Sequence, residues 1–113
     1  MNPYPGEIWL ADLGLTARTR PVLVVSRYDP DPPRNLIIYI PLTTQYRESP
    51  YEVALPRLRF LDQQSYVNVQ GLGSIEKFRL ERRLGKLSDN VMAEIKNTIR
   101  FVLDLETNFI RTN

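Results

Sequence analysis

The sequence contains neither cysteine nor histidine among its 113 residues. The lack of cysteine excludes disulfide bonds, thiolate zinc sites and cysteine nucleophiles, and the lack of histidine removes the most common general base. The carboxylates show no metal-ligand spacing, and the five glycines form no phosphate-binding loop of the kind found in nucleotide-binding proteins. We therefore expect no metal ion and no other cofactor.

Long hydrophobic segments are also missing. The longest apolar run covers residues 36–42 and is far shorter than the roughly 20 residues needed to cross a bilayer. No positively charged start followed by an apolar stretch opens the chain, so a cytoplasmic location is the default expectation. The content of 42% hydrophobic and 25% charged residues is typical of a globular chain, and the length suits a single domain over residues 1–113.

The charge is small in total but uneven along the chain. The formal net charge is +2, yet residues 57–87 hold seven basic and three acidic side chains, which gives this segment +4. Most of the basic residues are arginines, whose planar guanidinium suits phosphate oxygens and stacks on bases. This pattern favours an anionic partner such as nucleic acid, and the solvated outer face of a sheet is the alternative that stays open.

Short alternating or β-branched segments predict an antiparallel sheet of five or six strands. We expect these strands at residues 7–13, 21–26, 35–42, 51–55, 65–70 and 82–87. Residues 21–26 are almost wholly apolar, which indicates a strand buried on both faces. Residues 75–79 are expected to form a helical turn, and Gly71 and Gly73 to allow a bend or a bulge.

A single long helix is predicted to begin at Ser88, which can cap the first free amides. The apolar residues that follow recur at three- and four-residue steps and form a stripe that must pack on the sheet. Its members are Val91, Met92, Ile95, Ile99, Val102 and Leu103. Because a compact barrel protects the edges of a small sheet, we predict an α+β fold with an SH3-like barrel and a C-terminal helix.

Two strand boundaries carry polar residues that could reach a cleft. Arg20 precedes Pro21, and proline excludes the α region for the residue before it, so the arginine is held in an extended backbone. Thr43 and Thr44 follow the third predicted strand. Taken alone, these residues are better explained as a surface arginine and as β-forming threonines with satisfied hydroxyls.

The order of these segments resembles the MazF/PemK family of toxin ribonucleases. The resemblance rests on GEIWLADL (residues 6–13), RPVLVVS (residues 20–26) and IPLTTQ (residues 40–45), followed by YEVAL (residues 51–55), QGL (residues 70–72) and RLGKLS (residues 83–88). It covers nearly the whole chain with similar spacing. The loop before Arg20 is shorter than is typical of the family and lacks its acidic residue.

The resemblance implies the toxin of a type II toxin–antitoxin system. Such a toxin is a homodimeric, metal-independent endoribonuclease that cleaves single-stranded RNA at short sequences and is inhibited by a cognate MazE-like antitoxin. The family's catalytic arginine and threonine fall on Arg20 and Thr43. Attack by the ribose 2′-hydroxyl would leave a 2′,3′-cyclic phosphate, a reaction that RNA supports and DNA does not.

Further residues are expected to bind the RNA. Arg18 is expected to contact phosphate, and the other candidates offer aromatic faces or polar groups for stacking and base-edge contacts. These candidates are Tyr28, Thr44, Gln45, Tyr46, Asn68 and Gln70. Two alternatives remain: a non-catalytic RNA- or peptide-binding barrel, and a gyrase-targeting toxin on the same fold.

Overall fold

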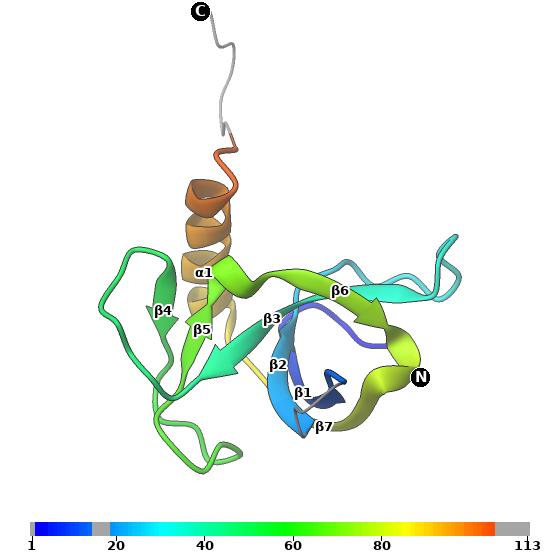
Figure 1. Cartoon of the computed structure of the whole chain (residues 1–113), viewed down its shortest axis with the longest axis horizontal. Helices are drawn as coiled ribbons and strands as arrows, with labels where there is room; N and C mark the ends of the chain where they lie inside the picture. Colours follow the sequence, from blue (N-terminus) through cyan, green and yellow to red (C-terminus); the bar gives the residue numbers. More distant parts are fainter. Residues whose placement is uncertain (1, 15–18, 106–113) are drawn as a thin grey trace, which may run out of the picture.

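The chain forms one antiparallel sheet followed by a C-terminal helix (Figure 1). The computed structural model describes residues 2–14 and 19–105. In chain order the elements are β1 (Glu7–Asp12), β2 (Thr19–Val24), β3 (Leu36–Thr43), β4 (Glu52–Ala54), β5 (Tyr66–Asn68), the 3₁₀ turn η1 (Val69–Gly71), β6 (Gly73–Glu76), the 3₁₀ turn η2 (Lys77–Arg79), β7 (Leu80–Lys86) and α1 (Asp89–Val102). The predicted α+β class is confirmed.

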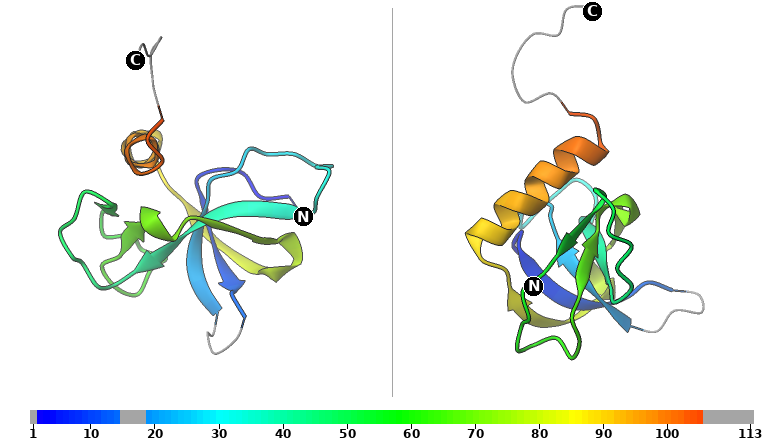
Figure 2. Two further views of the ribbon diagram at one scale, coloured as in Figure 1. Left: turned by 45° about the horizontal axis from the view of Figure 1, so that its top comes forward. Right: turned by 90° about the vertical axis from the view of Figure 1, so that its left-hand side faces the viewer.

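The strands pair in the order β4-β5-β3-β2-β1-β7, and β6 pairs with the first half of β3. All of these pairings are antiparallel, and the sheet bends strongly around β1, β2 and β3 (Figures 1 and 2). Within residues 2–14 and 19–105, no pairing joins the two edge strands β4 and β7. The closed SH3-like barrel therefore remains a prediction.

The central strands bury side chains on both faces. Ile8, Leu23 and Ile40 contribute to a core shared with β4, β5 and α1, whereas Trp9 and Val22 belong to a second core inside the bend of the sheet. Successive residues of a strand point to opposite faces, so a strand between two cores must be apolar at every position. The prediction of a doubly buried second strand is confirmed by its three fully buried members, Val22–Val24.

The prediction of a helical turn over residues 75–79 is partly wrong. The sheet has seven strands rather than the predicted five or six. Residues 73–76 form β6, which pairs with β3 through Leu36↔Glu76 and Ile37↔Ile75, and only Lys77–Arg79 form a helical turn. The free edge of β3 supplies backbone partners far away in sequence. This long-range ladder decides the conformation, and no local pattern of residues could reveal it.

Helix α1 packs beside β4 and η1 (Figures 1 and 2). The side chain of Ser88 accepts a hydrogen bond from the backbone N–H of Val91 at 3.3 Å, so Ser88 is the helix cap that the sequence predicts. Met92 and Ile95 are buried, but Leu103 follows the last helical residue and is 46% exposed, so it does not belong to the predicted stripe. No helix within the described ranges is long and apolar enough to span a membrane.

A buried carboxylate joins β1 to β7. One oxygen of Glu7 accepts hydrogen bonds from the indole N–H of Trp9 at 3.0 Å and from the backbone N–H of Tyr4 at 3.1 Å. The other oxygen pairs with Nε of Arg83 at 3.1 Å. Burial alone would raise the pKa of Glu7, but these hydrogen bonds outweigh burial and hold its pKa below the ordinary value.

This lowered pKa predicts a loss of stability in acid. The folded state binds the Glu7 proton less tightly than the unfolded chain, so the stabilisation is complete above the unfolded pKa and disappears as the pH falls through the lower folded pKa. Glu7→Gln should reduce the free energy of unfolding by about 1–2 kcal/mol at pH 7 and should flatten the acid limb below about pH 4–5. Urea denaturation across this pH range measures both effects. An equally steep acid limb in wild type and Glu7→Gln would contradict the prediction.

Candidate active site

A pocket opens where β3 leaves β2. Strand β3 pairs with β2 as far as Pro41, whereas its last residues, Leu42 and Thr43, pair only with β5. Strand β5 lies on the other side of β3 from β2, so β2 and β3 separate after Pro41 and leave a pocket of about 390 Å³ between the start of β2 and the end of β3. Its lining residues are Arg20, Pro21, Leu42, Thr43, Thr44, Gln45 and Ser65. The two candidate catalytic residues thus line one pocket.

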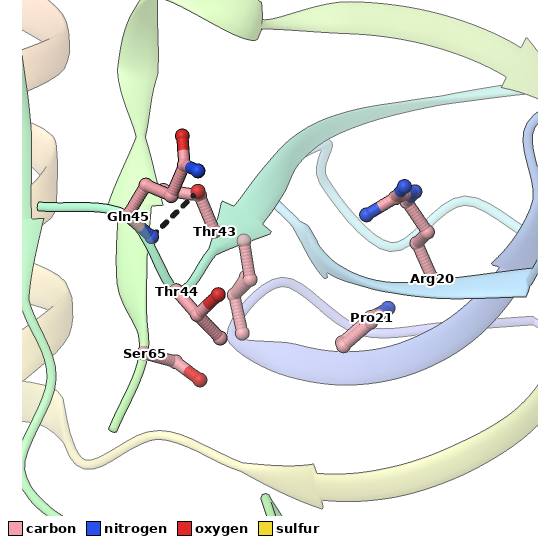
Figure 3. A pocket seen from close by; sticks show the side chains of 7 residues that line it. Arg20, Pro21, Thr43, Thr44, Gln45 and Ser65 are labelled. Atoms are coloured by element: carbon pink, nitrogen blue, oxygen red, sulfur yellow. Dashed lines mark hydrogen bonds between the residues drawn. The ribbon is translucent and has the colours of Figure 1, made fainter. Parts of the chain in front are cut away.

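Arg20 and Thr43 lie on opposite sides of this pocket (Figure 3). Arg20 stands in the extended backbone of β2, where it pairs with Ala11 of β1. Its side chain is exposed, and among the described residues no carboxylate forms an ion pair with it. The guanidinium can therefore accept an anion in the pocket as its partner.

The hydroxyl of Thr43 is oriented by the chain that follows it. Its Oγ1 accepts a hydrogen bond from the backbone N–H of Gln45 at 3.1 Å (Figure 3). This contact tightens the turn after β3 and leaves the hydroxyl hydrogen free to be donated. Thr44 and Gln45, both exposed, line the same pocket, as their predicted role in RNA binding requires.

A second pocket of about 230 Å³ adjoins the first, and the two share Thr43 and Gln45. Its other lining residues are Arg47, Ser49, Tyr51, Glu52, Asn68 and Gln70. Together we call the two pockets the polar groove. The predicted RNA-binding residues Asn68 and Gln70 are thereby brought next to Thr43, about 25 residues earlier in the chain.

The strand register explains why polar side chains gather in this groove. Thr43 stands opposite Tyr66, and Glu52 stands opposite Asn68, so these four side chains share one face of the β3-β5-β4 sheet. The intervening residues Leu42, Val53 and Val67 point to the opposite face and are buried in the core. Alternation along three strands therefore separates a polar groove from an apolar core.

Gly71 allows η1 to lie close to β3. A Cβ atom at this position would stand 2.7 Å from Cγ of Pro41 and 3.3 Å from Nδ2 of Asn68, so only glycine fits without displacement. The close approach holds Asn68 and Gln70 beside the end of β3. The sequence predicts a bend at this glycine, but its contact with Pro41 is a product of the tertiary structure.

The remaining predicted residues fall in different places. Tyr46, 47% exposed, stacks on Tyr66 at a centroid distance of 4.3 Å and an interplanar angle of 3°, next to the groove. Tyr28 follows the far end of β2 and stacks on Tyr4, and it lines neither pocket of the groove. Arg18 lies outside the described residues.

Sequence reasoning missed several residues of the groove. Ser65 is buried and donates its hydroxyl to the backbone oxygen of Gln63 at 3.0 Å, while Arg47 and Glu52 line the second pocket. The pairing of Glu52 with Asn68 would have identified Glu52 as a groove residue, but that register depends on contacts between strands distant in sequence.

The groove can bind and stabilise negative charge on a phosphate. It offers the guanidiniums of Arg20 and Arg47, two threonine hydroxyls and the amides of Gln45, Asn68 and Gln70. Among the described residues, no three acidic side chains lie close enough together to hold a metal ion. The fold and the groove thus define an α+β protein with a polar groove, suited to an anionic ligand, at the opening of a bent antiparallel sheet.

Comparison with known proteins identifies the family of this chain. Residues 4–103 match the family model of the PemK-like, MazF-like toxins of type II toxin–antitoxin systems. The chain is also 32% identical over 103 residues to the probable endoribonuclease MazF5 of Mycobacterium tuberculosis, covering 90% of this chain and 94% of that protein. The chain therefore belongs to the MazF/PemK toxin family, and the resemblance seen in its sequence is confirmed.

Solved structures agree with this assignment. One is an endoribonuclease in complex with its cognate antitoxin from a mycobacterial species, with a TM-score of 0.81, 26% identity and coverage of 94% of this chain and 99% of that one. Another is the M. tuberculosis toxin MazF-mt6, with a TM-score of 0.78, 27% identity and coverage of 88% and 98%. The fold extends over almost the full length of both neighbours.

Proposed function

We propose that this toxin is a metal-independent endoribonuclease that cleaves single-stranded RNA, mRNA in particular, at a short sequence. The observation that carries the proposal is the shared pocket of Arg20 and Thr43, which lie 23 positions apart in the chain. Family membership supports the toxin role, and the names of the mycobacterial relatives support the ribonuclease activity.

The proposed reaction is an internal displacement at phosphorus. The ribose 2′-oxygen forms a bond to phosphorus and loses its proton, the bond from phosphorus to the 5′-oxygen breaks, and that oxygen gains a proton. The products are a 2′,3′-cyclic phosphate and a 5′-hydroxyl. Arg20 stabilises the additional negative charge on the phosphoryl oxygens, because its guanidinium is a cationic donor of several hydrogen bonds. The Thr43 hydroxyl donates a hydrogen bond to a non-bridging oxygen or orients the 2′-hydroxyl.

The rest of the polar groove positions the strand. Tyr46 offers an exposed aromatic face on which a base can stack, and its own stacking on Tyr66 holds that ring in place. The amides of Gln45, Asn68 and Gln70 can make hydrogen bonds to base edges, which are accessible only in unpaired RNA. This division of roles explains why the strand must be single.

Incubation of the pure protein with a long single-stranded RNA in excess EDTA tests the proposal. We expect discrete fragments that end in a 2′,3′-cyclic phosphate, together with no cleavage of a DNA of the same sequence, because DNA lacks the attacking hydroxyl. Sequencing of the 5′ ends gives the cleavage motif. Intact RNA that nevertheless binds the protein would support a non-catalytic RNA-binding protein and would refute the nuclease.

We also propose the partners and the assembly that accompany this activity. An antitoxin with an acidic tail would bind the exposed guanidinium of Arg20 and block the groove, ordering as it binds. The solved complex of a mycobacterial relative with its cognate antitoxin supports such a partner. A homodimer, closure of the bent sheet as an SH3-like barrel, and a location in the cytoplasm with the mRNA complete the proposal.

A further inference from the structure

We propose that the second pocket of the polar groove binds a guanine base next to the cleaved phosphate, and that Glu52 selects it. The inference rests on the proposed ribonuclease function, because it assigns the specificity of the same groove. The second pocket has an unusual feature for a surface that binds RNA. Glu52 is the only carboxylate that lines either pocket in the described part of the chain, and a carboxylate there repels the phosphates that the groove must admit.

The position of Glu52 suits contact with a base rather than with the scissile phosphate. Arg20 and Thr43 line the first pocket, where the reacting phosphate lies in the proposed mechanism, whereas Glu52 lines only the second. The two pockets meet at Thr43 and Gln45. A nucleotide whose phosphate occupies the first pocket can therefore place a neighbouring base in the second.

The carboxylate of Glu52 is held in place by the backbone. Its Oε1 accepts a hydrogen bond from the N–H of Arg47 at 3.0 Å, and the backbone N–H of Glu52 itself donates to the oxygen of Ser49 at 3.2 Å. Each carboxylate oxygen has two acceptor sites, so both oxygens of Glu52 can still accept from a ligand. The side chain is thus fixed as a two-point acceptor.

Guanine is the base that matches such an acceptor. Its Watson–Crick edge places the N1–H and N2–H donors side by side, so it can donate two parallel hydrogen bonds to one carboxylate. Adenine and cytosine present one exocyclic donor beside an acceptor, and uracil presents one donor between two acceptors. The amides of Asn68 and Gln70, which line the same pocket, can donate to the guanine O6. The N1–H, N2–H and O6 groups of the guanine Watson–Crick edge then all have hydrogen-bond partners.

The first test of the inference is the cleavage of a random RNA library. We expect guanine to be enriched at one fixed position beside the cleaved bond. Glu52→Gln keeps an acceptor for the Arg47 N–H but opposes an amide N–H to the donors of guanine, so it should lower the preference for guanine over adenine by about tenfold to a hundredfold. Glu81→Gln is the matched control, because it removes the same charge from an exposed residue of β7 outside the groove and should leave the preference unchanged.

Binding of uncleavable oligonucleotides separates this inference from the nuclease proposal. Short RNAs with a 2′-deoxy sugar at the cleaved position, carrying guanine or adenine at the enriched position or at each position in turn, are compared by fluorescence anisotropy. Guanine-selective binding that Glu52→Gln abolishes would support the subsite even if the protein cleaved nothing. The inference is overturned if no position prefers guanine, or if Glu52→Gln retains the wild-type preference while circular dichroism shows the native fold.

Discussion

Replacing Arg20 with alanine is expected to reduce the rate of RNA cleavage by a factor of about 10²–10³, because it removes a preorganised cationic donor from the developing phosphoryl charge. The side chain is exposed and forms no ion pair among the described residues, so the free energy of unfolding should change by less than about 0.5 kcal/mol. Single-turnover cleavage of a defined RNA, together with urea denaturation, measures the two quantities.

Two comparison variants show whether the loss of cleavage is specific to Arg20 in the polar groove. Arg34→Ala removes another exposed arginine, which lies before β3 and outside the polar groove, and should leave the cleavage rate within about threefold of wild type. Arg20→Lys keeps the charge but loses the planar fork, so it should recover only part of the lost activity. Cleavage by Arg20→Ala at the wild-type rate would remove this residue from the mechanism.

Replacing Thr43 with valine is expected to reduce cleavage by a similar factor, about 10²–10³, because valine retains the shape but has no hydroxyl to donate. Valine also loses the acceptor for the Gln45 N–H, at a cost of about 0.5–1.5 kcal/mol in stability. Thr43→Ser preserves both the donor and the acceptor. It should therefore restore most of the activity, which separates the hydroxyl from the packing of the methyl group.

The double variant Arg20→Ala/Thr43→Val tests whether the two residues act on one phosphate. Groups that stabilise the same transition state are not additive, so the double variant should lose much less than the product of the two single losses. A loss equal to that product would indicate independent roles and would contradict a common reaction centre.

Local sequence patterns predicted the structure correctly where interactions between residues close together in the chain determine it. Ser88 caps the helix, and the apolar spacing through Ile95 marks its buried side, because both depend on residues within one or two turns. The apolar run at residues 22–24 likewise indicated a strand between two cores. The prediction failed at Leu103 and at residues 75–76, where the end of the helix and the free edge of β3 determine the structure.

The presence of Arg20 and Thr43 in one site could be predicted only through the family resemblance. Neither Arg-Pro nor Thr-Thr has a spacing that would indicate chemistry by itself. Tyr28 is a plausible stacking residue in sequence, but the structure pairs it with Tyr4 away from the groove. No feature of the sequence distinguishes Glu52, because an isolated acidic residue in a short alternating strand is ordinary.

The amino-acid sequence alone was enough to establish the α+β class, the helix, the doubly buried strand and the absence of histidine and cysteine chemistry, since composition and short-range periodicity carry these properties. The three-dimensional structure was needed to locate the groove. The pairing of β3 with β2 stops after Pro41 while β5 pairs with the other side of β3, and the separation of β2 from β3 opens the pocket between Arg20 and Thr43. The register of β4 on β5 places Glu52 beside Asn68. Register and partner choice depend on the total energy of contacts between distant segments, which no local pattern encodes.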